Sequence, residues 1–271
     1  MKSAENIKLI ASDIDDTLIV GGGSRLSPRN KEALLKAQEK GIKVVLISGR
    51  HYKFLHPSLF EDLPMDVIGT INGACLTNRE GKTIAKFPMS EEMMNVIVDV
   101  SIKHDIGVGF KFEDNVVTYA NHEKFIDGYL LKGVEPESLV IDDSKERKHH
   151  LEYGLPLGTF LIGDVVEAME EYRSYIPDLI FASSFRNGYD VYAPGVSKAT
   201  AIEKYLEIEG LDWSNVIAFG DAGNDAPMFE KAGIGVAMGN SRDGLEKVAD
   251  IIAKECKDDG FAKALEELKI I

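Results

Sequence analysis

The chain of 271 residues is poor in cysteine, with only Cys75 and Cys256. These two lie far apart and form no CxxC pair, so the sequence indicates neither a disulfide framework nor a zinc site. It also shows no basic N-terminal segment followed by a long apolar stretch, and no run reaches the roughly 18 apolar residues that a membrane-spanning helix needs. We therefore expect a reduced, cytoplasmic setting and no membrane partner.

Positive charge is scarce as well. The 31 Lys and Arg stand against 45 Asp and Glu, which gives a net charge of −14 at pH 7. A surface of this charge repels nucleic-acid backbones and anionic membranes. The most basic stretch, "SKERKHH" at residues 144–150, is short and mixed in sign, which is typical of a solvated helix or loop. We expect no nucleic-acid partner, and the sequence leaves the oligomeric state open.

Short apolar runs that end in Gly, Asp, Ser or Asn recur along the chain, among them "IKLIASD", "IKVVLISG", "NVIAFGD" and "GIGVAMG". Such runs are typical of strands buried on both faces of a parallel sheet. Helical patterns separate several of them, and one begins with a Ser27 cap and Pro28 and stops at Gly41. The alternation predicts an α/β fold with a doubly wound, Rossmann-like parallel sheet as its core.

The pattern changes in the middle of the chain, from about residue 82 to 190. Helical patterns are fewer there and strands alternate polar with apolar residues, as in a hairpin that turns at Asp114 and Asn115. The α/β pattern then resumes with "VYAPGVSKATAI". We therefore predict an α+β domain at residues 82–190, inserted into a core formed by residues 1–81 and 191–271.

Aspartates follow the first predicted strand in "KLIASDIDDTLI", where Asp13, Asp15 and Asp16 stand within four positions. Ligands of open α/β sheets bind beyond the carboxyl ends of the strands. A spacing of two puts Asp13 and Asp15 on one side of the chain, and carboxylates so close repel unless a divalent cation such as Mg²⁺ binds them. The alternative for this stretch alone is an Asx turn or a helix cap.

Polar side chains follow two further strands in the same way. They are Ser48 and Arg50 in "LISGR", and Asp221, Asn224 and Asp225 in "FGDAGND". Lys198 in "GVSKATAI" begins a predicted helix, where the helix dipole also favours an anion. Three strand ends and one helix start therefore indicate a single site that binds a divalent cation and an anionic ligand.

With these motifs the sequence resembles a haloacid dehalogenase (HAD) superfamily phosphatase, and more narrowly its Cof-like branch with a large α+β cap. The segments "DIDDTL", "ISGR", "NGA", "GVSKATAI" and "GDAGND" stand in the family's order and cover nearly the whole chain. The resemblance implies Mg²⁺-dependent hydrolysis of small phosphorylated metabolites, sugar phosphates foremost. It also implies that the inserted cap closes during turnover, excludes water and sets substrate specificity.

The resemblance assigns a role to each motif residue. Asp13 would be the nucleophile that becomes an aspartyl phosphate, and Asp15 would protonate the leaving oxygen and later activate water. Mg²⁺ would be held by the Asp13 carboxylate, the Asp15 carbonyl and Asp221. Asn224 and Asp225 would orient these ligands without binding the metal themselves.

Ser48 and Lys198 would hold the phosphoryl oxygens, with Lys198 also paired to Asp13. Candidate substrate contacts are Gly49, Arg50, Asn72 and Gly73. Arg50 has a structural ion pair as its alternative role, and Asn72 a plain Asn-Gly turn.

Two positions depart from the family pattern. Asp16 replaces a frequent glycine, and we expect it to cap the following turn. Ala222 stands where relatives often carry Asn, and neither change removes a catalytic group.

Other activities remain open at the level of sequence. The substrate could be flavin mononucleotide or pyridoxal phosphate, and the same scaffold also serves phosphomutases. A sensor that binds a phosphorylated ligand without turnover is a third class, although it would need no paired nucleophile and acid. Candidate cap contacts, each equally consistent with a core or surface role, are Lys111, His122, Tyr129, Arg186 and Tyr189.

Overall fold

The structure is a computed structural model that describes residues 4–21, 23, 25–55, 59–60, 65–130, 137–184 and 188–271. The chain divides into a core unit, Met1–Ala85 with Ser197–Ile271, and an inserted unit, Lys86–Val196. The inserted unit thus begins four residues after the expected boundary at 82 and ends six residues after that at 190. Strand β5 (Thr83–Lys86) extends the core sheet, and strand β11 (Gly188–Tyr192) belongs wholly to the sheet of the inserted unit, so a boundary at 190 would cut it.

The core unit is built on a sheet whose described strands follow the order β14-β13-β12-β1-β2-β3-β4-β5. All neighbours from β14 to β3 run parallel, while β4 is antiparallel to β3. The predicted doubly wound parallel sheet is thus confirmed, with an antiparallel extension at one edge. Besides β5, its strands are β1 (Leu9–Asp13), β2 (Lys43–Ile47), β3 (Val67–Thr70), β4 (Cys75–Asn78), β12 (Val216–Gly220), β13 (Ile234–Ala237) and β14 (Ile251–Ile252).

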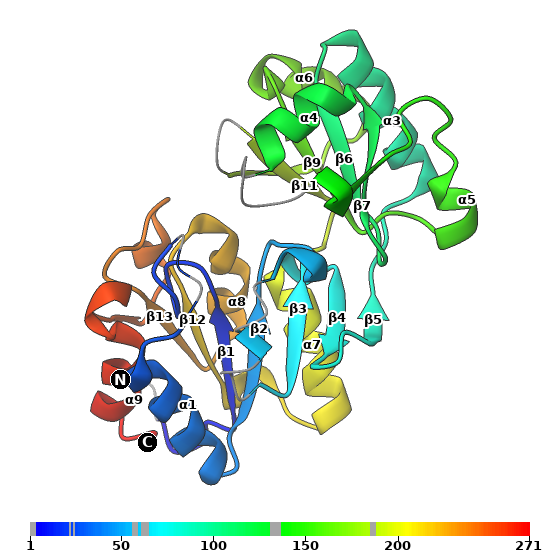
Figure 1. The fold of residues 1–271 in the computed structure, drawn as a ribbon. Coiled ribbons are helices and arrows are strands. Elements are labelled where there is room, and N and C mark those ends of the chain that lie inside the picture. Colours follow the sequence, from blue (N-terminus) through cyan, green and yellow to red (C-terminus); the bar gives the residue numbers. More distant parts are fainter. Residues whose placement is uncertain are drawn as a thin grey trace. The chain divides into compact units, whose positions relative to one another are not determined.

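Helices cover both faces of this sheet (Figure 1). Helices α1 (Pro28–Glu39) and α9 (Gly260–Glu267) share a buried cluster with Ile10, while α7 (Lys198–Glu209) and α8 (Ala226–Lys231) share another with Leu9. Successive β1 side chains therefore enter opposite layers, as strand geometry requires. Helix α1 begins as predicted, since the Ser27 hydroxyl accepts the Asn30 N–H at 3.1 Å.

The inserted unit has its own sheet, in the order β10-β11-β9-β6-β7-β8. Strands β6 (Gly107–Lys111) and β7 (Val116–Ala120) pair antiparallel, which confirms the hairpin at Asp114 and Asn115. The other strands are β8 (Val140–Asp142), β9 (Gly158–Ile162) and β10 (Ile180–Ser183).

Helices α3 (Glu91–Lys103) and α6 (Val165–Tyr175) pack on one face of this sheet and share its apolar core. Helix α4 (His122–Tyr129) contacts the same sheet through Phe125, whose ring lies where a side chain at Gly109 would stand. A short helix, α5 (His149–Tyr153), completes the unit. No helix in the described part of the chain has the length and apolar character needed to cross a bilayer.

Candidate active site

The site residues come from the ends of neighbouring strands in the core sheet (Figure 1). Asp13 is the last residue of β1, Ser48 follows β2, and Asp221 follows β12. Because β12, β1 and β2 are adjacent and parallel, their carboxyl ends lie at the same edge. The fold thus brings together the three strand ends that the sequence indicated.

Lys198 is the first residue of α7 and its side chain is only 2% exposed. Its Nζ donates to Asp13 Oδ1 at 2.6 Å and to Asp225 Oδ1 at 2.5 Å. The lysine therefore joins the end of β1 to the loop after β12. A buried ammonium is tolerated because two carboxylates surround it.

Asp225 is completely buried and both of its carboxylate oxygens accept hydrogen bonds. Oδ1 receives the Lys198 bond, while Oδ2 accepts the backbone N–H groups of Asp221 at 2.9 Å and Ala222 at 3.0 Å. The carboxylate thereby fixes the loop that carries Asp221. Asp225 therefore contacts other candidate site residues, Lys198 and Asp221, through hydrogen bonds.

Three buried carboxylates, those of Asp13, Asp221 and Asp225, offer oxygens within 4.8 Å of one another. Asp221 Oδ1 receives the Thr17 hydroxyl at 3.4 Å, whereas Asp221 Oδ2 is buried with no hydrogen-bond donor among the described residues. Since carboxylate oxygens suit Mg²⁺ and both oxygens of Asp225 are engaged, Asp13 and Asp221 fit the role of ligands.

Burial and charge shift the pKa values of this group. Burial raises the pKa of the Asp13 carboxyl well above its usual range; Lys198 opposes this rise, and Asp225 and Asp221 add to it. The pKa of Asp221 rises to about 6, chiefly through burial and then through Asp225. For Lys198, burial disfavours the charge, but Asp13 and Asp225 outweigh it and raise the pKa. The single positive charge of Lys198 does not balance the three carboxylates, and a divalent cation would offset the remaining negative charge.

The sequence alone did not indicate two further neighbours of Asp221. Thr17 lies in the "DIDDT" stretch, so its motif could have suggested it. Arg242 donates its backbone N–H to the Asp221 carbonyl at 2.8 Å, and its guanidinium lies 3.5 Å from Asp221 Oδ2. No pattern around Arg242 signals this contact, because it depends on the loop after β13.

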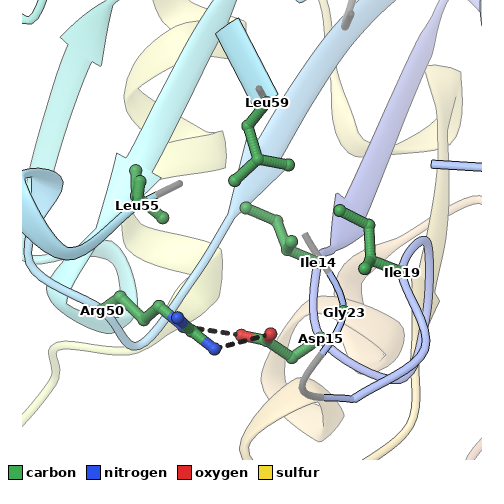
Figure 2. A pocket seen from close by; sticks show the side chains of 7 residues that line it. All are labelled: Ile14, Asp15, Ile19, Gly23, Arg50, Leu55 and Leu59. Carbon is green, nitrogen blue, oxygen red and sulfur yellow. Dashed lines mark hydrogen bonds and ion pairs between the residues drawn. The ribbon is translucent and has the colours of Figure 1, made fainter. Parts of the chain in front are cut away.

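Asp15 lies in the loop after β1, with its side chain 36% exposed. Both of its oxygens accept hydrogen bonds from Arg50, at 3.0 Å from Nε and 2.9 Å from Nη2 (Figure 2). Of the two roles open for Arg50, the structure shows the ion pair. Asp16 has a φ of 58° and its Oδ1 accepts the Gly21 N–H at 2.7 Å, so it caps the following turn as expected.

Asn72 is buried in the 3₁₀ turn Ile71–Gly73 that follows β3. Its Oδ1 accepts from Asn224 Nδ2 at 2.9 Å, and its backbone N–H donates to the Ser48 carbonyl at 2.9 Å. The Ser48 hydroxyl in turn accepts the Arg50 N–H at 3.1 Å. These bonds tie the ends of β2 and β3 to the loop after β12.

The two glycines of the predicted site lie where another segment of the chain comes close to the backbone. Gly73 has a φ of +87°, and a Cβ there would lie 2.2 Å from the Ser197 carbonyl oxygen. A Cβ at Gly49 would lie 2.9 Å from Asn72 Nδ2. Glycine at both positions therefore lets the strand ends pack against the start of α7 and against Asn72.

The candidate contacts in the inserted unit differ in burial. Lys111 is buried and pairs with Asp190, and Tyr129 is buried and stacks on Phe125 with ring centroids 4.8 Å apart. Both residues thus make these contacts within the inserted unit. The remaining candidates are His122 and Tyr189, which are half-buried, and Arg186, which lies outside the described residues.

Comparisons with known proteins identify the family of the chain. The family model of haloacid dehalogenase-like hydrolases matches residues 10–265. The chain is 29% identical over 262 residues to 5-amino-6-(5-phospho-D-ribitylamino)uracil phosphatase YcsE of Bacillus subtilis, covering 96% of this chain and 95% of that one. It is 26% identical over 267 residues to pyridoxal phosphate phosphatase YbhA of Escherichia coli, covering 94% and 96%.

Among solved structures, that of a HAD subclass IIB sugar phosphatase is similar to the chain, with a TM-score of 0.82 and 25% identity over 97% of this chain and 100% of that one. The match therefore includes the inserted unit as well as the core. Since the family model spans nearly the whole sequence, the chain belongs to the haloacid dehalogenase-like hydrolases, as its ordered motifs predicted.

Proposed function

We propose that the protein is a Mg²⁺-dependent phosphomonoester hydrolase that forms an aspartyl phosphate on Asp13. Membership of the family makes it a HAD-type phosphatase that acts on small phosphorylated molecules. The metal, the residue roles and the preferred substrate class belong to the proposal. The observation that carries it is the buried group at the strand ends, in which Lys198 bonds Asp13 at 2.6 Å and Asp221 keeps one oxygen without a donor.

In the first step an Asp13 carboxylate oxygen attacks phosphorus, and the bond from phosphorus to the leaving oxygen breaks. Asp15 gives that oxygen its proton. In the second step water attacks the phosphorus of the aspartyl phosphate, Asp15 takes the proton from water, and Asp13 and inorganic phosphate are regenerated. Because Lys198 bonds Asp13 Oδ1, the attack is assigned to the other oxygen, Oδ2.

The surrounding residues would hold the reacting group in place. The ammonium of Lys198 and the hydroxyl of Ser48 would bind phosphoryl oxygens, at the start of a helix whose dipole favours the same charge. The Asp13 and Asp221 carboxylates and the Asp15 carbonyl would hold Mg²⁺. When bound, the ion would supply positive charge that neutralises Asp13, Asp221 and the phosphoryl group.

Sugar phosphates are the first substrates to test. They are the substrates named for the similar subclass IIB structure, while 5-amino-6-(5-phospho-D-ribitylamino)uracil and pyridoxal phosphate are named for the two relatives. Specificity is assigned to the inserted unit, because the family resemblance places the leaving-group contacts there.

Phosphate release is the test of this proposal. The panel contains glucose 6-phosphate, flavin mononucleotide and pyridoxal phosphate, each with Mg²⁺ and with chelator. The enzyme forms are wild type, Asp13→Asn, and the control Asp99→Asn, which changes an exposed carboxylate on α3. We expect Mg²⁺-dependent phosphate release that, of the two variants, only Asp13→Asn abolishes. Incubation with ³²P-labelled substrate should also attach a phosphoryl group to the wild-type protein that survives acid quenching. The Asp13→Asn variant should lose this label.

Two other outcomes would replace the proposal. Transfer of the phosphoryl group to a second hydroxyl, without net phosphate release, would identify a phosphomutase. Binding of the panel without any turnover would identify a sensor. Release that is insensitive to Asp13→Asn would contradict the aspartyl phosphate.

A further inference from the structure

We propose that Arg50 is the positioning residue for Asp15: its guanidinium holds the carboxyl group that exchanges a proton with the leaving oxygen. In this role Arg50 acts through Asp15 and makes no contact with the phosphoryl group. The inference rests on the proposed function, since it presumes that Asp15 is the acid and base of the reaction.

The pair has a geometry that fixes orientation as well as distance. Nε of Arg50 lies 3.0 Å from Asp15 Oδ2, and Nη2 lies 2.9 Å from Asp15 Oδ1. Two parallel bonds from a planar fork set the plane of the carboxyl group, which a single point charge such as an ammonium does not. Each carboxylate oxygen has two lone pairs, so this pairing leaves one on each oxygen, where the proton that passes to the leaving oxygen is carried.

Arg50 is itself held by the ends of two strands. Its backbone N–H donates to the Ser48 hydroxyl at 3.1 Å, and its carbonyl accepts the Ile71 N–H at 2.9 Å. The loop of Asp15 is closed by its own bonds, since the Asp16 N–H donates to the Ile19 carbonyl at 2.7 Å. The ion pair therefore links two backbones that are each already fixed.

Packing gives the Asp15 side chain little other support. Asp15 and Arg50 lie together at one end of a pocket of about 260 Å³, counted with the open solvent at its mouth (Figure 2). The rest of the lining is Ile14, Ile19, Gly23, Leu55 and Leu59. Among the described residues, Arg50 donates the side-chain hydrogen bonds to the Asp15 carboxylate, so its guanidinium sets the orientation of a group that borders open space.

The pair is too exposed to serve mainly as a folding contact. The side chain of Arg50 is 43% exposed and that of Asp15 36%. Ion pairs at such positions contribute little to folding stability, since water screens them. Replacement of the Arg50 guanidinium should therefore leave the melting temperature nearly unchanged and lower kcat/KM instead.

The test uses two leaving groups that differ in their need for a proton. The leaving p-nitrophenolate of p-nitrophenyl phosphate is stable without one, whereas an alkoxide is not. The second substrate is the fastest of the alkyl phosphates glucose 6-phosphate, flavin mononucleotide and pyridoxal phosphate. The quantity compared is kcat/KM, which covers the steps up to loss of the leaving group, for wild type, Arg50→Lys, Asp15→Asn and the double variant.

We expect Arg50→Lys to lower kcat/KM for the alkyl phosphate by about tenfold or more, within the roughly 100- to 10,000-fold that a general acid contributes. For p-nitrophenyl phosphate the loss should stay below about threefold, as for Asp15→Asn. The double variant should be no slower than Asp15→Asn alone, because Arg50 acts through Asp15. Arg29→Lys, which alters an exposed pair with Glu266 at 2.7 Å, should change neither substrate.

Three results would overturn the inference. An equal loss on both substrates would show that Arg50 contacts the phosphoryl group. Additive losses in the double variant would show that Arg50 and Asp15 act independently. Wild type that hydrolyses neither substrate would refute the proposed function itself, an outcome distinct from the first two because those require an active enzyme.

Discussion

Replacement of Lys198 by methionine should destabilise the core unit by about 3–5 kcal/mol, the usual cost of leaving a buried charge without its partner. Lys198 is 2% exposed and bonds both Asp13 at 2.6 Å and Asp225 at 2.5 Å. Methionine fills much the same volume but supplies no charge, so the two carboxylates then face each other uncompensated. In a chain of this size the loss corresponds to a fall in melting temperature of roughly 6–20 °C.

The assay is thermal unfolding followed by circular dichroism, with chelator present, at about pH 7.5 and about pH 5. The deficit should shrink at the lower pH, because burial raises the pKa of Asp13 and protonation removes its charge. Asp225→Asn in the Lys198→Met background should recover part of the loss. The control Lys204→Met, on the exposed face of the same helix, should cost less than about 0.5 kcal/mol.

A melting temperature of Lys198→Met within about 2 °C of wild type at the higher pH would refute this reasoning. It would mean that water or backbone rearrangement stabilises the carboxylates without the lysine.

Three further outcomes follow from the geometry of the core unit. The metal-free protein should become more stable as pH falls through about 6. Burial raises the pKa of Asp221 to about 6, so the folded state binds the proton more tightly than the unfolded chain. In parallel thermal melts, Asp221→Asn should reduce this dependence of stability on pH. In denaturant titrations, Gly73→Ala should lower the free energy of unfolding by about 3 kcal/mol or more, because the new Cβ would lie 2.2 Å from the Ser197 carbonyl oxygen. Gly210 also has a positive φ but has open space around it, so Gly210→Ala should lower it by only about 1–2 kcal/mol. Ser27→Ala should lower the free energy of unfolding by about 1 kcal/mol through loss of the cap of α1, and an unchanged urea midpoint would contradict that role.

The fold and the convergence of the strand-end residues could be predicted because their signals are local. Buried parallel strands appear as short apolar runs, and the residue that ends each run lies at the edge where ligands bind. Asp13, Ser48 and Asp221 each directly end or follow such a run, and helix α7 begins at Lys198. Strand order and helix caps then bring these residues to one place.

Other contacts could not be predicted because they depend on which loops meet in space. The pairing of Arg50 with Asp15 selects one of two roles that the sequence left open. The approach of Arg242 to Asp221 joins loops that no motif connects. The C-terminal limit of the inserted unit differs from the expected residue 190 because β11, close to the resumed α/β pattern, pairs with β9 of that unit.

The order of strands in the core sheet has a consequence for synthesis of the chain. Strand β1 carries Asp13 and pairs on one side with β2, but on the other with β12, as in the register of Leu9 with Val216. While a ribosome makes the inserted unit, the β12-facing edge of β1 has no partner from its own sheet, and Lys198 and Asp221 do not yet exist. The inserted unit can fold during this interval, since all strands of its sheet lie within residues 86–196. Every nascent chain therefore exposes one edge of a buried strand until β12 (Val216–Gly220) emerges, and exposed strand edges favour aggregation.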